Sequence, residues 1–156
     1  MLEVYKKILS YVPKEKYLAY IGIILSMASV VLKVFAYYYL SRFLVELIIF
    51  NNISDAKSYA LIIVGLLVGG ITLYGVAGLV THILGFRLET NLRKYGIRGL
   101  SKASFSFFDT HPSGKTRKII DDNASQTHMI VAHLIPDNAG AILMPILLLI
   151  LGFCVS

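Results

Sequence analysis

Gly114-Lys115-Thr116 has the residue types of a loop that binds the phosphates of a nucleotide. Such a loop also needs a glycine five residues before Gly114, so that its backbone amides can wrap around the phosphates. That position holds Asp109, whose charge would repel a phosphate, and no β-strand pattern precedes it. We therefore expect no nucleotide site in this part of the chain.

Asp121-Asp122 has the residue types of a Mg²⁺ site. Hard cations prefer several oxygen ligands, and Ser125 stands where a third carboxylate would be expected. We expect the pair to lie on a solvated helix face instead, where one of the carboxylates pairs with Arg117 or Lys118.

His128 and His133 are five residues apart, which places them about 140° apart around an α-helix, whereas ligands four residues apart would share a face. No cysteine lies near them, and the chain has no Ser/His/Asp or Cys/His pattern with supporting context. The sequence therefore predicts no catalytic residue, no cofactor-binding residue and no metal site in this chain.

Polar and aromatic residues within long apolar runs are more informative, because ionisable groups there are costly and usually face a bundle interior or a water-filled cavity. The candidate pathway-lining residues on this basis are Lys33, Tyr37, Tyr38, Arg42, Glu46 and His82. Other roles remain open: Lys33 could extend to an interface, the tyrosines could form an interfacial belt, and His82 could be structural. Arg42 and Glu46 could pair, being four residues apart, or lie outside the membrane.

The chain that positions these residues is too apolar for a soluble globule. It has 156 residues, of which 56% are hydrophobic and 15% charged, against about 25% charged in a soluble domain. This composition excludes a disordered chain, a collagen-like fibre and a disulfide scaffold, and it argues against a soluble enzyme. The net charge of +6 sits beside apolar runs, which indicates membrane lipid and not nucleic acid as the partner.

The pattern of apolar runs predicts an all-α membrane bundle. We expect an amphipathic N-terminal elbow over residues 1–16, a first span over 17–50, a second helix over 58–107 and a third over 115–156. A helix needs about 20 residues to cross the hydrocarbon core, so the second should continue beyond the membrane. Gly65-x-x-x-Gly69 in the second run has the spacing of tightly packed membrane helices.

The polar segment 87–137 contains eight basic and five acidic residues, and the N-terminal arm contains four basic residues. The turn between the first two spans contains only Lys57. By the positive-inside rule, the N-terminus and the polar segment should be cytoplasmic. The chain ends at Ser156 inside an apolar run, from which we expect it to be part of a longer protein.

Within the polar segment, Phe105, Phe107 and Phe108 should end the second helix. The following string, Asp109-Thr110-His111-Pro112-Ser113-Gly114, has the composition of a turn. Pro112 and Gly114 suit a sharp reversal between two long helices.

Leu92-Arg93-Lys94, Phe107-Phe108-Asp109, Gly114 and Ile119-Ile120-Asp121-Asp122 together resemble the first intracellular loop of ABC transporters of the exporter fold. In that family a long second helix ends at an aromatic pair and is followed by a short coupling helix. The resemblance implies that a nucleotide-binding domain docks on the tip of this loop. The implied coupling residues are Phe107, Phe108, Asp109, Thr110, His111, Pro112, Ser113 and Gly114.

The resemblance also implies partners outside this sequence. ATP and Mg²⁺ would bind to a nucleotide-binding domain, which is absent from the chain, and a second transmembrane subunit, identical or different, would complete the transporter. The expected location is the bacterial inner membrane. The fuller loop string, with Ile119-Ile120-Asp121-Asp122-Asn123-Ala124, looks most like the metallophore (siderophore-type) branch.

The function expected from the resemblance is that of a transmembrane segment that couples ATP hydrolysis to alternating access. The chain alone would not be an enzyme, although the complete transporter would hydrolyse ATP. The alternative is a self-contained pore-forming or scaffold protein of the membrane. An intramembrane enzyme would need an acid/base or metal constellation, which the sequence does not contain.

Overall fold

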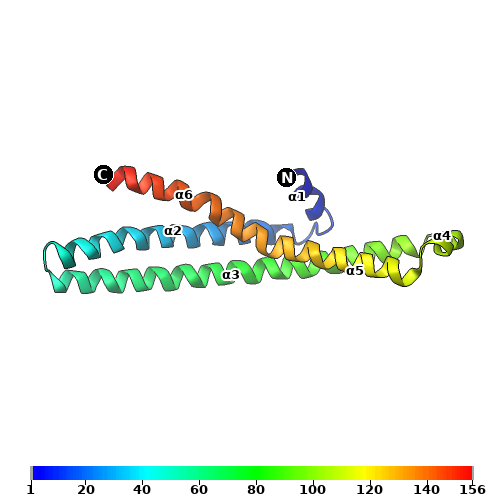
Figure 1. Cartoon of the computed structure of the whole chain (residues 1–156), viewed down its shortest axis with the longest axis horizontal. Helices are drawn as coiled ribbons and strands as arrows, with labels where there is room; N and C mark the ends of the chain where they lie inside the picture. Colours follow the sequence, from blue (N-terminus) through cyan, green and yellow to red (C-terminus); the bar gives the residue numbers. More distant parts are fainter. Residues whose placement is uncertain (1, 156) are drawn as a thin grey trace. The chain divides into compact units, whose positions relative to one another are not determined.

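A computed structural model describes residues 2–155, without the side chains at positions 2, 4, 5, 154 and 155. These residues form helices and turns and no strand, which confirms the all-α prediction. The elements are α1 (Leu2–Leu9), α2 (Lys16–Ile48), α3 (Ile53–Leu100), α4 (Phe105–Thr110), α5 (Ser113–Met129), the π-helical turn η1 (Ile130–Leu134) and α6 (Ile135–Val155) (Figure 1). Positions 1 and 156, where the predicted elbow and third helix begin and end, lie outside the described residues.

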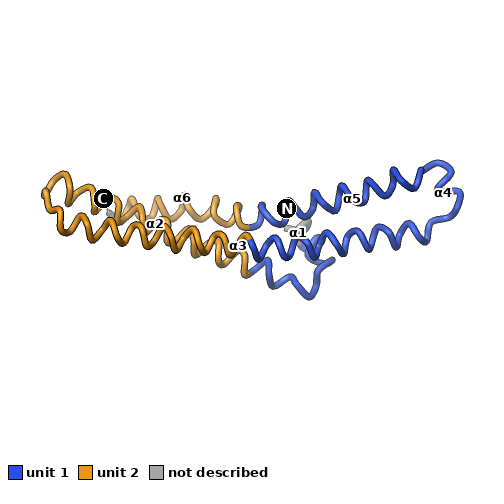
Figure 2. Tube along the Cα trace, turned by 90° about the horizontal axis from the view of Figure 1, so that it is seen from below, with its two compact units in different colours: residues 1–20, 79–135 blue, residues 21–78, 136–156 orange. Residues whose placement is uncertain are grey.

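Three helical segments are long and apolar enough to cross a membrane by length and composition: Lys16–Ile48, Ile53–Leu100 and Ser113–Phe153. They correspond to the three predicted spans, so the chain is an integral membrane protein. The chain divides into two compact units, residues 1–20 with 79–135 (unit 1) and residues 21–78 with 136–156 (unit 2) (Figure 2).

In unit 2, α2 and α3 approach closely at small residues. The Ser29 hydroxyl is buried and donates to the Gly70 carbonyl oxygen at 2.7 Å. A Cβ atom at Gly69 would lie 3.3 Å from Leu32, whereas one at Gly65 would meet nothing within 4 Å. The predicted packing motif is therefore wrong in its first member, and the close approach is made by the adjacent pair Gly69 and Gly70.

The turn between α2 and α3 depends on two asparagines. Asn51 has a φ of 51°, a left-handed conformation that asparagine tolerates better than most residues. The Asn52 side chain accepts a hydrogen bond from the backbone amide of Asp55 at 3.3 Å and donates to its carboxylate at 2.7 Å. Such an N-terminal cap satisfies amides that the first turn of a helix leaves free.

In unit 1, α3 packs against α5 and η1 through a narrow apolar core. Leu84 and Leu88 of α3 are fully buried, as is Val131 of η1. A Cβ at Gly85 would lie 3.1 Å from the His128 ring, and one at Gly96 would lie 2.7 Å from Ile120, so the two helices are in close contact at both levels.

The predicted end of the second helix is wrong, because α3 stops at Leu100 and not at Phe107. The amides of Lys102 and Ala103 bond to carbonyls three residues back, and the Ser101 hydroxyl donates to the Arg98 carbonyl. Ser104 is extended, with ψ of 157°, and occupies the N-cap position of the separate helix α4, where its hydroxyl bonds to that of Ser106 and not to the backbone. Serine side chains bond readily to nearby backbone and so favour helix ends over helix interiors.

The third helical segment runs from Ser113 to Val155 and changes to π-helical geometry at Ile130–Leu134. Pro136 has no backbone N–H, so the carbonyl of Ala132, four residues earlier, loses its α-helical donor. The Thr81 hydroxyl of α3 donates to this carbonyl at 2.9 Å. The prediction that the segment continues past Pro136 is confirmed, and the π-helical turn is the local adjustment that precedes the proline.

Candidate functional site

The tip that joins α3 to α5 consists of residues 101–112, which include the short helix α4. Phe107 and Phe108 are half-buried, and their rings are 5.4 Å apart, edge to face. The ring of His111 stacks on that of Phe107 at 4.5 Å, and the His111 amide donates to the Phe107 carbonyl at 3.0 Å. Phe107 therefore organises the tip from within.

The aromatic residue that the tip presents outward is Phe105, which is 94% exposed. As apolar anchors for a docked domain, Phe107 and Phe108 were expected to be exposed in this chain; this expectation is corrected, because both are half-buried. Helix α4 has only six residues. The Phe107 ring is partly covered because it stacks on His111, whereas Phe105, the first residue of the helix, has no preceding helical turn to cover its ring.

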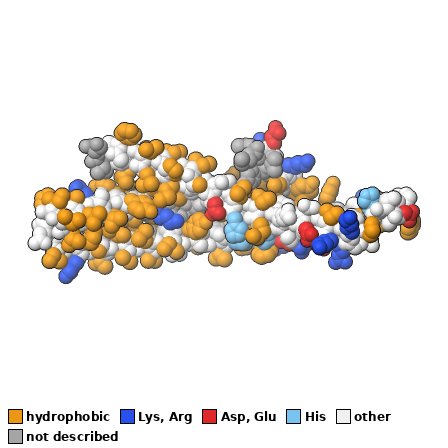
Figure 3. Space-filling model, in the orientation of Figure 1, with side chains coloured by type: hydrophobic (Ala, Val, Ile, Leu, Met, Phe, Trp, Pro, Cys, Tyr) orange, Lys and Arg blue, Asp and Glu red, His pale blue; other side chains and the backbone are white. Residues whose placement is uncertain are grey.

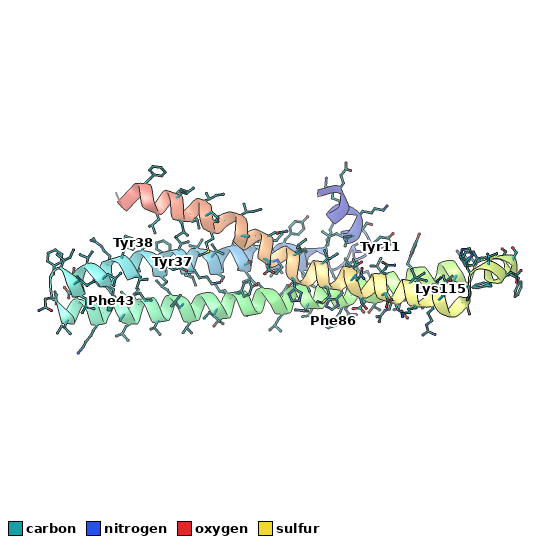
Figure 4. The ribbon with its side chains drawn as sticks, viewed as in Figure 1. Tyr11, Tyr37, Tyr38, Phe43, Phe86 and Lys115 are labelled. Atoms are coloured by element: carbon teal, nitrogen blue, oxygen red, sulfur yellow. The ribbon has the colours of Figure 1, made fainter. Side chains whose placement is uncertain are left out.

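The reversal into α5 is made by His111 and Pro112, which are both extended, with ψ of 93° and 129°. Gly114 lies in the first turn of α5, and no described glycine has a positive φ. The expectation that Gly114 contributes an unusual backbone angle is therefore wrong. Asp109, Thr110 and Ser113 are exposed, as is Lys115, which Figure 4 labels near the beginning of α5.

A polar network (Glu89, Arg93, Asp121, Ser125 and His128) joins α3 to α5. Glu89, whose side chain is 15% exposed, accepts from Arg93 Nη2 at 2.7 Å. It also accepts from the Ser125 hydroxyl at 3.0 Å and is 2.7 Å from Nδ1 of His128. Arg93 Nε lies 3.3 Å from Asp121 without hydrogen-bond geometry.

Asp121 is also 3.8 Å from Arg117, which confirms the pairing expected for that carboxylate. Asp122 is exposed, and no group of three or more His, Cys, Asp or Glu residues within the described chain could hold a metal ion.

The structure brings three histidines together around His82. Its Nδ1 is 3.4 Å from Nε2 of His128, and its ring is 5.0 Å from that of His133. The angular argument that separated His128 from His133 is wrong because the π-helical turn between them changes the rotation per residue. The aromatic ring of Phe86 closes one side, with its centroid 4.4 Å from that of His128 (Figure 4).

A second polar cluster lies in unit 2 and contains Lys33, Tyr74 and Asp137. Lys33 Nζ is 5.0 Å from the centroid of the Tyr74 ring, a distance at which a cation is attracted to the ring face. The Tyr74 hydroxyl donates to Asp137 Oδ1 at 2.5 Å. A tyrosine thus connects a cationic and an anionic side chain within segments apolar enough to span a membrane.

The other candidate pathway residues are not gathered into this cluster by any hydrogen bond or ring contact of the described residues. Tyr38 contacts the ring of Tyr39, while Tyr37 is exposed (Figure 4). Arg42 is exposed and Glu46 half-buried, and these two described side chains form no ion pair with each other. Consecutive residues of a helix point in different directions, so the tyrosines cannot all line one surface.

Sequence reasoning missed four residues of these sites: Phe105, Tyr74, Glu89 and Asp137. A charged residue next to an apolar run was a visible signal for Asp137 and Glu89. Tyr74 lies in an apolar run without charge, and its partnership with Lys33 depends on the register between α2 and α3, which no local pattern specifies.

The fold and the site together define a class of membrane protein. It has three apolar helical segments, a short helix that joins the two longest of them, and a polar network between these two. Residues 19–156 match the model of the ABC transporter transmembrane region, and the chain belongs to this family. The resemblance seen in the loop motifs is therefore confirmed.

The chain is similar to two curated proteins of this kind. It is 30% identical over 93 residues to the mycobactin import ATP-binding/permease protein IrtA of Mycobacterium tuberculosis, covering 60% of this chain and 11% of that protein. It is 25% identical over 75 residues to the protein of the same name from Mycolicibacterium smegmatis, covering 48% of this chain and 9% of that protein. The matches thus span roughly a tenth of each relative. No solved structure is significantly similar to the chain.

Proposed function

We propose that the chain is the leading part of a transmembrane subunit that couples ATP hydrolysis to alternating access of a substrate site. The observation that supports this most directly is the tip of unit 1, where the short exposed helix α4 connects two helices of a family member. Helix α4 is small, and the stacking of His111 on Phe107 holds it together. It can therefore move as a rigid unit with a domain that docks on it. Rigid-body motion of packed helices would then change access to the substrate.

In this proposal the tip, including Phe105 and the coupling residues 107–114, docks on a nucleotide-binding domain that carries ATP and Mg²⁺. A second transmembrane subunit, identical or different, completes the pathway. The N-terminus and the tip face the cytoplasm of a bacterial cell, as the distribution of Lys and Arg favours. The chain itself is not an enzyme, whereas the complete transporter is an ATP-hydrolysing translocase.

Lys33 is the strongest candidate among the pathway residues, because it lies over the ring of Tyr74, whose hydroxyl in turn bonds to Asp137, within an apolar segment. Tyr37, Tyr38, Arg42, Glu46 and His82 remain candidates. The similar proteins are named for mycobactin import, and we infer a substrate of the same metallophore class. The comparisons give no support to a self-contained pore or scaffold.

The test uses the complete transporter with Phe105→Ala, Phe108→Ala or Asp109→Ala. ATP binding should be unchanged, while transport per ATP hydrolysed should fall by about tenfold or more, because an aromatic anchor at an interface contributes about 1.4 kcal/mol or more. Transport into vesicles and ATP hydrolysis would be measured on the same preparation.

Ile97→Ala is the matched control, since Ile97 is an exposed apolar residue of α3 outside the tip. It should leave the ratio of transport to hydrolysis unchanged. A normal ratio in all three tip variants would contradict the coupling role, as would an equal loss in the Ile97 variant.

A further inference from the structure

His82, His128 and His133 form a titratable cluster that the proposed coupling mechanism does not use. They are three of the four histidines of the chain, and they come from α3, α5 and η1. The His128 side chain is 9% exposed and touches a carboxylate on one side and another imidazole on the other. Histidine is the side chain whose charge ordinarily changes between pH 5 and 8.

The carboxylate fixes where the protons of this cluster lie. An ionised Glu89 can only accept, so Nδ1 of His128, 2.7 Å away, carries a hydrogen. Nε2 of His128 then faces Nδ1 of His82 at 3.4 Å, and one hydrogen can bond the two nitrogens. When His128 is neutral, His82 donates this hydrogen; when His128 is charged, His128 donates it. The contact therefore survives both the neutral and the singly protonated state of the pair.

A second proton removes the contact, because both facing nitrogens then carry hydrogens and both rings carry charge. The two links to His128 differ in strength. The bond to Glu89 is short and charge-assisted, whereas the 3.4 Å contact to His82 is at the long end for a hydrogen bond. The contact between His82 and His128 is thus the one that repulsion breaks.

The surrounding charges do not compensate the second proton. Glu89 already pairs with Arg93 at 2.7 Å, and Asp121 is shared between Arg93 and Arg117. The remaining titratable group next to His82 is His133, whose ring is 5.0 Å away and would add a third positive charge. Among the described residues, Glu89 is the carboxylate that contacts the cluster.

The cluster lies where two helices of unit 1 are pressed together. A Cβ at Gly85 would be 3.1 Å from the His128 ring, and the Thr81 hydroxyl donates to the Ala132 carbonyl of η1. π-Helical turns occur often at functional sites. An adjustment of η1 could therefore follow a change in the charge of His128 or His133.

We propose that His82 and His128, held on Glu89, form a proton-sensitive clamp between α3 and the α5–η1 segment. The clamp is closed while the pair carries no more than one extra proton, and it opens when both imidazoles are charged. The clamp follows from unit 1 alone and does not depend on the proposed function.

Paired spin labels on the full chain in lipid nanodiscs test the clamp. Labels at Ile83→Cys and Met129→Cys, in a Cys154→Ser background, occupy exposed positions next to His82 and His128. Continuous-wave electron paramagnetic resonance should show dipolar broadening at pH 8 that decreases reversibly at pH 5. Unchanged broadening across this range would overturn the proposal.

Three variants separate the clamp from general acid unfolding. His82→Asn should keep the broadening at pH 5, because a second charge cannot form. Glu89→Gln should open at a lower pH than the parent chain, since the carboxylate 2.7 Å from the His128 imidazole is lost. His111→Asn, which removes the histidine at the tip, should behave as the parent chain does. Loss of broadening in His82→Asn, or no shift in Glu89→Gln, would contradict the mechanism.

Discussion

Two stretches of the same helix, α3, pack by different chemistry. In residues 53–78, which belong to unit 2, the contacts to α2 include close approaches at Gly69 and Gly70, one serine hydroxyl on a backbone carbonyl and Lys33 over the Tyr74 ring, with no ion pair between the two helices among the described residues. In residues 79–100, which belong to unit 1, the contacts to α5 include the ion pairs and hydrogen bonds of Glu89 and Arg93. Figure 3 shows one face of the molecule, where apolar side chains cover most of unit 2 and a few charged groups interrupt them.

We attribute the difference to the medium in which each stretch is expected to lie, lipid for residues 53–78 and water for most of residues 79–100. Lipid is as apolar as a leucine side chain, so helices within it associate through close backbone approach and not through hydrophobic burial. The exposed surface of α3 in unit 2 is accordingly built of large apolar residues, among them Leu61, Val64, Val68 and Ile71. Outside the membrane, water solvates charges, and a mixture of apolar contacts and ionic pairs joins the helices.

Removal of the Glu89 carboxylate should have the largest effect on unit 1. Glu89→Ala removes the bonds to Arg93, Ser125 and His128 and leaves the Arg93 guanidinium and the His128 imidazole without the carboxylate that they share. We expect a loss of about 2–3 kcal/mol in the free energy of unfolding, because partly buried charges lose their partner. Denaturant unfolding of the chain in detergent micelles would measure it.

Asp122→Ala is the control for this variant, because Asp122 is an exposed carboxylate of α5. Surface substitutions away from special features usually change stability by about 0.5 kcal/mol or less. An equal loss in both variants would mean that net charge, and not the network around Glu89, determines the stability of unit 1.

Gly96→Ala should have the next largest effect. The added Cβ would lie 2.7 Å from Cγ2 of Ile120, so α3 and α5 must shift or the isoleucine must move. Overpacking of this kind costs about 1–3 kcal/mol, which the higher helix propensity of alanine offsets by about 1 kcal/mol. We therefore expect a net loss of about 1 kcal/mol, measured by the same unfolding experiment.

Gly99→Ala should increase the stability of the chain instead of lowering it, since a Cβ at Gly99 would meet nothing within 4 Å. This variant should gain about 0.5–1 kcal/mol from helix propensity. Ile120→Ala combined with Gly96→Ala should recover part of the steric loss. If Gly96→Ala and Gly99→Ala were both stabilising, the close approach of α3 and α5 at Gly96 would be wrong.

The sequence predicted the helices well where their cause is local. Long apolar runs, the turn at Asn51 and the loop motif around Asp109 each depend on neighbouring residues. The end of α3 at Leu100 was missed because the helix closes with tight backbone bonds and the Ser101 hydroxyl on the Arg98 carbonyl, and Gly99 was interpreted as part of a continuous helical face. The π-helical turn before Pro136 was missed because it depends on which helix supplies a donor to Ala132.

The candidate sites were predictable in part for the same reason. The position of the tip follows from a contiguous string of residues, but the outward ring of Phe105 depends on how Phe107 stacks within α4. The partnerships of Lys33 with Tyr74 and of Glu89 with His128 join residues about forty positions apart in the chain. Only the register between helices determines them.

Ser29→Ala should have the smallest effect, and it sharpens the contrast between the two stretches of α3. The Ser29 hydroxyl donates to the Gly70 carbonyl, a group that α3 can also satisfy from within its own helix. Hydrogen bonds between membrane helices contribute about 0.6 kcal/mol on average, so we expect a loss of that size in detergent unfolding. Ser41→Ala is the control, because the Ser41 hydroxyl bonds within its own helix to the Tyr38 carbonyl. A loss for Ser29→Ala as large as that for Glu89→Ala would show that polar contacts dominate unit 2 as well, and the distinction drawn between lipid and water as the cause would then fail.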